Sequence, residues 1–446
     1  MFRERNCRDI LFLKTLLPRP LHFRAGSIYR TKTKMKNRSK IAIILATVLI
    51  AAATVSIVFS LEKKNDGTLP KYVFLFIGDG MGLNHVAATD SFLAYQDSCY
   101  GGGYLTFTGF PVVGLARTWC STSGVTDSAA SGTAIACGQK TSSGRIGETE
   151  DKSPLKSMAY DFKELGYQVG IMSDGPVNHA TPATFFAHSD RRSKYYDISL
   201  QMADCGLDFL GGSEIIDRYG KKHDKEDVVK LIEDKGNAQV CFGLDALKAS
   251  TAATKIFLPE EPEDCIDFDN ADKNKNYDLS MAGKGMQAPD LVEACLGTFD
   301  DEKPFFIMCE QGYVDWASHS ARTMRAIESV KLLDKAVAKA YEFYLEHPDE
   351  TLIIVTSDHE TGGFSFGTEG YRTAWKVFDE KWEALGHDDS LLSDEENAAL
   401  NNEGRVSWGS HSHTGAPVPV YAVGKHAERF TGFYENSQIK EKIFGE

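Results

Sequence analysis

Acidic and imidazole side chains recur at short spacings in the second half of the sequence. Asp315 and His319 are four residues apart, a spacing that places both side chains on the same face of a helix. Asp358 and His359 are adjacent, and His413 precedes an apolar run near the C-terminus. Because zinc in proteins is held by mixtures of carboxylate and imidazole ligands, these residues together predict a metal centre.

A serine within a stretch of small residues is a candidate nucleophile. Ser128 lies near the start of a predicted helix within residues 126–136. The positive end of the helix dipole and a coordinated metal would lower the pKa of its hydroxyl. An acyl hydrolase would instead need a G-x-S-x-G elbow, and Gly124 and Ala130 do not frame Ser128 in that way. The pattern therefore favours a serine that a metal activates.

The elements that must position these groups follow one another in a regular way. Short apolar runs alternate with helical patterns, which is typical of a mainly parallel sheet covered by helices on both faces. The predicted strands are residues 72–77, 168–172, 304–309, 351–356 and 418–423. An amphipathic helix is predicted over about 323–345, where apolar residues recur at helical spacing. We therefore predict an α/β fold of three layers, α/β/α, with a large central sheet.

Candidate ligands directly follow several of these strands. Asp79 comes just after the first, Glu310 directly after the third, and Asp358 and His359 just after the fourth. Open α/β sheets place their sites at the carboxyl ends of the strands. An oxygen-rich pocket beside zinc-type ligands would suit magnesium. We expect a metalloenzyme site at this edge of the sheet.

Two other motifs are incomplete. Residues 78–82 could form a dinucleotide-binding turn, but Leu83 stands where the last glycine is needed. Residues 272–278 imitate the first half of a calcium loop, yet Tyr277 occupies the position of its glycine and Gly283 that of its glutamate. We interpret the first as part of the predicted metal site and the second as a solvated loop.

Six motifs in a fixed order make the sequence similar to the alkaline phosphatase family. They span about residues 71–424, nearly all of the chain after its first 61 residues. The motifs are Gly78-Asp79-Gly80-Met81-Gly82, Asp127-Ser128-Ala129, Thr181-Pro182-Ala183 followed by Arg192, Glu310 with Asp315 and His319, Asp358-His359, and His413-Thr414-Gly415. One such motif can arise by chance, but six in the order of the family do not.

The resemblance implies a site with two Zn²⁺ and one Mg²⁺. Its ligands would be Asp315, His319 and His413 for the first zinc, Asp79, Asp358, His359 and the Ser128 alkoxide for the second, and Asp79, Thr181 and Glu310 for magnesium. Each zinc set leaves a position for substrate or nucleophile, as in catalytic zinc sites. The magnesium set contains only oxygen.

The resemblance also implies the reaction, which is hydrolysis of phosphate monoesters through a phosphoserine on Ser128. Arg192 would hold two phosphoryl oxygens through paired hydrogen bonds. Asp127 and two positions where members of the family differ, His179 and Trp316, would tune the magnesium and the phosphate from outside the direct ligands.

Two alternative functions stay open at this point. A phosphodiesterase or phosphonate hydrolase of the same superfamily could use the same metal core, although Arg192 favours a dianionic monoester. A non-catalytic metal- or phosphate-binding protein is the alternative from another class, but it would need neither Ser128 nor Arg192.

The first 61 residues differ from the rest. Residues 1–40 hold 12 Lys and Arg and two acidic residues, and residues 41–61 carry no charge. Read from Met35, this is a secretory signal peptide that could be cleaved near Ser60, and read from Met1 it is an uncleaved membrane anchor. Both interpretations export the rest of the chain to the periplasm or the cell exterior, with membrane contact only through 41–61 if that segment is uncleaved.

Charge and composition limit the partners and the number of domains. Residues 41–446 hold 37 basic and 61 acidic residues without a basic run after Lys40, which excludes nucleic-acid binding driven by charge. We expect residues 62–446 to form one catalytic domain with insertions at about 211–285 and 362–408, the second resembling the crown of the family. Neither the pairing of cysteines nor a homodimer, the state of many members of the family, is decided by the sequence.

Overall fold

The computed structural model describes residues 69–259 and 287–445. The strands of the central sheet are β1 (Tyr72–Gly78), β2 (Val112–Arg117), β3 (Gln168–Ser173), β4 (Phe209–Gly211), β5 (Ala238–Phe242), β6 (Thr254–Leu258), β7 (Phe305–Gln311), β8 (Thr351–Thr356), β13 (Val418–Gly424) and β14 (Gly432–Glu435). Their order across the sheet is β14-β2-β13-β8-β1-β7-β3-β4-β6-β5. Only β13 runs antiparallel to its neighbours, β8 and β2. The prediction of a large, mainly parallel sheet is confirmed.

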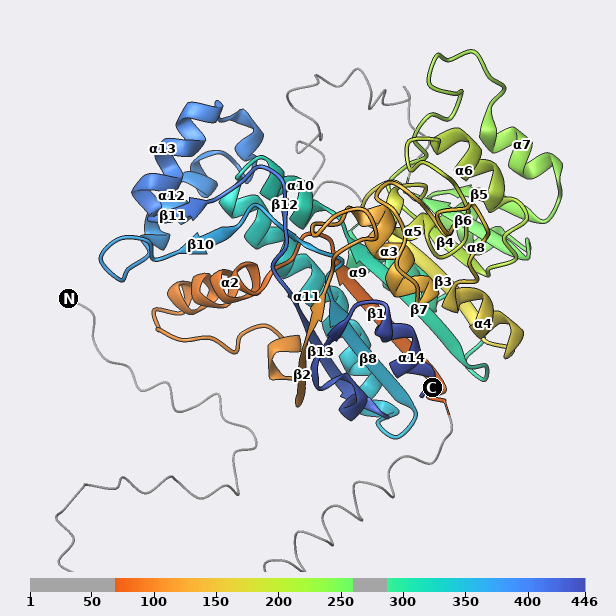
Figure 1. Ribbon diagram of the computed structural model, residues 1–446, viewed down its shortest axis with the longest axis horizontal. Coiled ribbons are helices and arrows are strands. Elements are labelled where there is room, and N and C mark those ends of the chain that lie inside the picture. The colour runs from red at the N-terminus through yellow and green to blue at the C-terminus, as the bar shows by residue number, and fades with distance from the viewer. Residues whose placement is uncertain (1–68, 260–286, 446) are drawn as a thin grey trace, which may run out of the picture. The chain divides into compact units, whose positions relative to one another are not determined.

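Helices lie on both faces of this sheet (Figure 1). They are α2 (Leu83–Gln96), α3 (Ser128–Cys137), α4 (Met158–Glu164), α5 (Ala180–Ala183), α6 (Tyr195–Met202), α7 (Val228–Asp234), α8 (Gly243–Ala249), α9 (Ala288–Leu296), α10 (Tyr313–His319), α11 (Thr323–Glu346), α12 (Trp375–Ala384), α13 (Asp394–Gly404) and α14 (Gln438–Phe444). The amphipathic helix predicted over about 323–345 is α11, and the five predicted strands are β1, β3, β7, β8 and β13.

The strand β1 shows why the fold has three layers. All seven of its residues are buried, and successive side chains point to opposite faces of the sheet. Val73, Leu75 and Ile77 pack in one apolar cluster with α3, α4 and α14, whereas Phe74 and Phe76 pack in a second cluster with α9 and α11. A strand covered on both faces is apolar throughout, as parallel strands usually are.

The stretch at about 211–285, interpreted as an insertion, contributes to the sheet itself. Its described part contains α7, β5, α8 and β6, and β6 and β5 extend the sheet beyond β4 in parallel. Because many Lys, Asp and Asn residues surround these short strands, the apolar pattern that would predict them is weak. The calcium-loop-like residues 272–278 lie outside the described residues.

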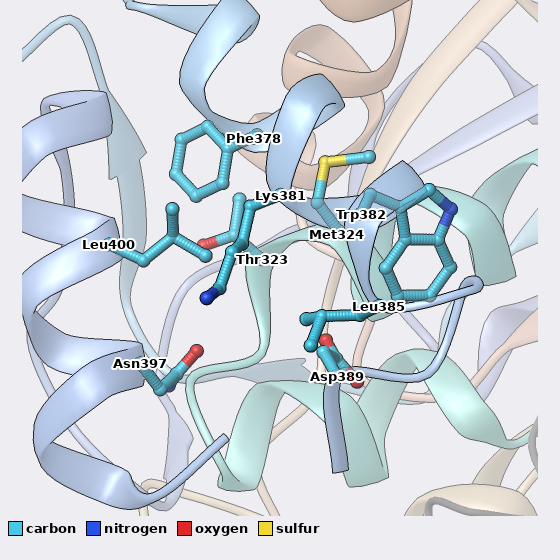
Figure 2. Close-up of a pocket in the computed structure, with 9 residues that line it drawn as sticks. All are labelled: Thr323, Met324, Phe378, Lys381, Trp382, Leu385, Asp389, Asn397 and Leu400. Carbon is cyan, nitrogen blue, oxygen red and sulfur yellow. The ribbon is translucent and has the colours of Figure 1, made fainter. Parts of the chain in front are cut away.

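The second predicted insertion, residues 362–408, is called the accessory segment below. It contains α12, α13 and the two strands of a small antiparallel sheet, β10 (Phe364–Phe366) and β11 (Val406–Trp408). Its apolar side chains, among them Phe378 and Trp382, pack with Phe92 of α2 and Met324 of α11. Figure 2 shows the small cavity left between these helices, whose volume of about 10 Å³ holds no more than one water molecule.

Two questions raised by the sequence, membrane attachment and cysteine pairing, concern the described residues only in part. No helix among these residues is long and apolar enough to cross a membrane, and the segment 41–61 lies outside them. Six cysteines of the described part are free thiols: Cys120, Cys137, Cys205, Cys241, Cys295 and Cys309.

Candidate active site

The central strands bring the predicted ligands to one edge of the sheet. β8, β1 and β7 are neighbours, and their register places Ile77 of β1 beside both Glu310 of β7 and Thr356 of β8. Asp79, which follows β1, therefore lies between Glu310 and the residues after β8. The side chains of Asp79 and Glu310 are completely or almost completely buried. Carboxylates so deep in a protein need a compensating positive charge.

The first ligand group consists of Asp315, His319 and His413. Asp315 and His319 are one turn apart on α10, and His319 Nε2 lies 3.3 Å from Asp315 Oδ2. His413 is in β12 (His413–Thr414), and its Nε2 lies 3.6 Å from Asp315 Oδ1 and 3.2 Å from His319 Nε2. Each histidine contacts a backbone carbonyl through Nδ1, His319 that of His411 and His413 that of Thr126. Both Nε2 atoms are therefore presented to one point, as zinc requires.

The second ligand group consists of Asp79, Asp358 and His359, with Ser128 beside it. His359 Nε2 lies 3.3 Å from Asp79 Oδ1, 3.2 Å from Asp358 Oδ2 and 3.3 Å from Ser128 Oγ. The backbone amides of Gly80 and His359 donate to the other oxygen of Asp358. Ser128 is the first residue of α3, so the positive end of that helix lies at its hydroxyl.

A third group lies on the far side of Asp79. Asp79, His179 and Glu310 each offer a ligand atom within 4.8 Å of the others. Thr181, in the short helix α5, is fully buried. His179 was predicted to act from outside the direct ligands. It lies instead among the possible metal ligands of this group, and its ring offers a nitrogen beside the carboxylate oxygens.

Arg192 is held in place at the edge of this constellation. It donates from Nη1 to Asp127 Oδ2 over 3.2 Å and from Nη2 to His179 Nε2 over 3.0 Å. Asp127 also caps α3 by accepting from the amide of Ala130. The His179 ring meets the ring of Trp316 edge to face. Asp127, His179 and Trp316 therefore form a connected support for the guanidinium and for the helix that carries Ser128.

The carboxylates of the site repel one another. Burial, with the nearby charge of Asp358, raises the pKa of Asp79 well above its usual range. Burial likewise raises the pKa of Glu310 to about 8 and that of Asp358 to about 7. Asp315 differs, because His319 lowers its pKa strongly against the effect of burial. At neutral pH the protein alone supplies too little positive charge for this many buried carboxylates.

Several buried oxygens of the site have no hydrogen-bond partner in the structure. They are both carboxylate oxygens of Asp79, Oγ1 of Thr181, Oε1 of Glu310 and Oδ2 of Asp358. An unpaired buried polar atom costs about 1–3 kcal/mol, so several in one place indicate a missing partner. Divalent cations, which accept carboxylate and hydroxyl oxygens as ligands, fit this set of atoms.

Comparison with known proteins agrees with this geometry. A family model described as alkaline phosphatase matches residues 70–229, 273–384 and 379–445. The chain belongs to the alkaline phosphatase family. Alkaline phosphatase 4 of Bacillus subtilis is 26% identical to it over 459 residues, which cover 93% of this chain and 96% of the relative. Membership of the alkaline phosphatase family makes the chain a phosphomonoesterase.

Solved structures of the alkaline phosphatase family have the same fold. The alkaline phosphatase from the Antarctic bacterium TAB5 is 27% identical, with a TM-score of 0.63 over 84% of this chain and 97% of that one. A variant of the TAB5 enzyme, changed at a histidine and carrying magnesium in its M3 site, matches over the same shares at 26% identity and a TM-score of 0.64.

Sequence reasoning missed two side chains that contact the ligands. Ser173, the last residue of β3, donates to Glu310, its register partner on β7. Thr361, three residues after Asp358, donates to Asp315. A polar residue at the end of a predicted strand is a usable signal for Ser173, but its partner follows only from the order of the strands. For Thr361 the nearby pair Asp358-His359 is the only signal.

Proposed function

We propose that this chain is an exported alkaline phosphatase that hydrolyses phosphate monoesters to an alcohol and inorganic phosphate through a phosphoserine on Ser128. The observation that carries the proposal is the position of Ser128. Its Oγ lies at the start of α3 and 3.3 Å from His359 Nε2, next to buried carboxylate oxygens without partners. A hydroxyl in such surroundings becomes a nucleophile when a bound cation lowers its pKa.

Two zinc ions and one magnesium ion suit the donors. Zinc fits Asp315, His319 and His413 in the first group and Asp79, Asp358, His359 and Ser128 in the second, and magnesium fits Asp79, Thr181 and Glu310. When bound, these cations would neutralise the negative charge that develops on the nucleophile, the phosphoryl group and the leaving group. A variant of the related TAB5 enzyme holds magnesium, which supports this ion as one of the three.

The protein's own groups account for the course of the reaction. Ser128 Oγ attacks phosphorus in line with the ester oxygen, whose bond to phosphorus breaks as the alcohol leaves. Arg192 donates hydrogen bonds to two of the remaining phosphoryl oxygens, held for this by Asp127 and His179. Water then attacks the phosphoserine, the bond between phosphorus and Ser128 Oγ breaks, and inorganic phosphate departs.

Export rests on the sequence of the N-terminal part. A basic segment before 21 uncharged residues at 41–61 supports a secretory signal or an anchor, and both lead the catalytic part out of the cytoplasm. We infer a role in releasing phosphate from monoesters outside the cytoplasm.

The test is phosphate release from p-nitrophenyl phosphate, measured for the purified protein with zinc and magnesium, after chelation, and for Ser128→Ala. We expect chelation to abolish turnover, zinc to restore it, and Ser128→Ala to lower kcat by about 10³-fold or more. Ser121→Ala, which changes an exposed serine seven residues earlier, is the control and keeps full turnover.

A diester, bis(p-nitrophenyl) phosphate, is assayed in parallel. Faster turnover of the diester than of the monoester would assign the site to a phosphodiesterase. No turnover of either ester by folded, zinc-loaded protein would contradict the catalytic proposal and favour a binding role.

A further inference from the structure

One buried hydroxyl contacts a member of each zinc-type ligand group. Thr361 ends the short strand β9 (Glu360–Thr361) and is completely buried. Its Oγ1 donates to Oδ1 of Asp315, in the first group, and lies 3.2 Å from Nδ1 of His359, in the second. Because the hydroxyl carries a single proton, its two contacts cannot both be donated.

The chemistry of the two partners decides the direction of each hydrogen bond. An ionised carboxylate such as Asp315 only accepts, so the proton of Thr361 must point to Asp315. Thr361 Oγ1 can then only accept from His359, and the proton of the imidazole must lie on Nδ1. His359 Nε2 is left with a free lone pair, and that atom lies 3.2–3.3 Å from Asp358, Asp79 and Ser128.

We propose that Thr361 is a positioning residue that fixes the Nδ1–H tautomer of His359 and couples the two ligand groups through its hydroxyl. The inference rests on the proposed function, because it concerns how the zinc ligands are prepared. A cation on His359 Nε2 makes Nδ1–H a stronger donor, which in turn strengthens the hydrogen bond from Thr361 to Asp315. The hydroxyl of Thr361 thus joins a ligand of one group to a ligand of the other.

The backbone holds the Thr361 side chain in this orientation. The amide of Thr361 donates to Gly80 O over 3.1 Å, and β9 pairs with β12 so that Thr361 lies opposite His413. Gly80 has φ +73°, and a Cβ there would lie 2.9 Å from Thr361 Oγ1 and 2.8 Å from Asp315 Cα. Position 80 thus accepts only glycine, and the space beside the hydroxyl is filled on that side.

The experiment compares Thr361→Val, which removes the hydroxyl at constant shape, with Thr361→Ser, which keeps it. Thr133→Val is the matched control, because Thr133 is also completely buried and its hydroxyl both donates, to Arg145 O, and accepts, from the amide of Gly147, without touching a ligand. Zinc affinity and stoichiometry of the full protein are measured by competition with a chromophoric chelator. Melting in excess chelator reports on the fold alone.

We expect Thr361→Val to weaken zinc binding by about 10- to 100-fold, the usual effect of losing a partner of a metal-binding histidine. Both zinc equivalents should weaken together, and Thr361→Ser should stay within about 3-fold of the wild type, because it restores the hydrogen bonds. Thr133→Val should lower the melting temperature in chelator and leave zinc affinity unchanged.

Equal zinc affinity of Thr361→Val and wild type would overturn the inference, even if the variant melts at a lower temperature, because the role would then be structural. Weakening of only one zinc equivalent would overturn the coupling. Failure of the wild-type protein itself to bind zinc would instead contradict the proposed function, so the two failures can be told apart.

Discussion

Two clusters of charged side chains, one including Asp315 of α10 and the other Arg322 and Arg325 at the start of α11, are built in opposite ways. The carboxylate cluster, Asp79, Glu310, Asp315 and Asp358, belongs to the active site and holds several oxygens without partners. The arginine cluster, Arg322, Arg325, Asp388 and Asp389, ties the accessory segment to α11 and contains its own positive charge.

The arginine cluster is largely complete without any ligand. Arg325 lies 3.2 Å from Asp388 and 3.1 Å from Asp389, and Arg322 donates to the carbonyls of Asp389 and Leu392 over 2.7 and 3.0 Å. Burial raises the pKa of Asp389, but the charge of Arg325 opposes the shift. For Asp79, burial and the neighbouring carboxylates act in the same direction. Buried acids therefore indicate a cation site where the protein itself supplies too little counter-charge.

The largest effect is expected from Asp79→Asn, which removes a charge shared by two ligand groups. Activity should fall by about 10³-fold or more, because a lost ligand removes several kcal/mol of transition-state stabilisation. In excess chelator, however, the variant should melt at or above the wild-type temperature, since one source of repulsion is gone. Phosphate release from p-nitrophenyl phosphate measures the activity, and calorimetry in chelator and in zinc measures the melting temperatures. A metal-free variant that melts well below the wild type would contradict the proposed contrast between the clusters.

Removal of metal from the wild type should itself lower stability. A ligand at about 1,000 times its Kd stabilises the folded state by about 4 kcal/mol, and its loss also leaves the carboxylates unscreened. The melting temperature in chelator and in zinc, at one fixed pH, checks this. Asp389→Asn is the comparison: it should lower both temperatures and leave the zinc-dependent increment in place. An unchanged melting temperature after complete removal of metal would count against the assignment of the carboxylate cluster.

Much of the fold could be predicted because its long elements have apolar patterns that a single sequence shows. β1 is apolar from end to end, β8 has four apolar residues between its terminal threonines, and α11 repeats its apolar residues at helical spacing over 24 residues. β5 and β6 escaped prediction because five-residue strands in polar surroundings give little signal. Burial between a neighbouring strand and helices, which is a tertiary property, makes them part of the sheet.

The site could be predicted as a set of residues but not as a set of contacts. Residue spacing and the ends of the predicted strands indicated Asp79, Glu310 and the histidines as candidates, and the structure places them together. The contacts of Thr361 with Asp315 and of Ser173 with Glu310 depend on which elements are neighbours in space. Spacing along one chain does not contain that information, because the partners lie 46 and 137 residues apart.

The arginine cluster can be broken selectively with Arg325→Met. Asp389 would then be buried without its cation, and we expect the free energy of unfolding to fall by about 3–5 kcal/mol. Zinc affinity should not change, since Arg325 pairs with Asp388 and Asp389 of the accessory segment. Denaturant unfolding measures the first and chelator competition the second. Lys331→Met on the same helix is the control, because its pair with Glu328 is partly exposed and should contribute no more than about 1 kcal/mol.

The smallest effect concerns the link between the two clusters, the turn after His319. Ala321 has a φ of +51°, and its carbonyl accepts from Asn397 and Asn401 of the accessory segment over 3.0 and 2.9 Å. Asn401 also accepts from Thr323 over 2.7 Å. We expect Asn401→Leu to cost about 1–3 kcal/mol of stability, because it leaves buried partners unpaired.

If the accessory segment helps to hold His319, Asn401→Leu should also weaken zinc at the first ligand group, by less than about 10-fold, since the effect passes through the backbone. The exposed neighbour Asn402→Ala should change neither stability nor zinc affinity. A loss of stability with unaltered zinc binding would show that the two clusters are independent, and that the accessory segment stabilises α11 without positioning the metal ligands. A loss of both would make the turn at Ala321 the physical connection between them.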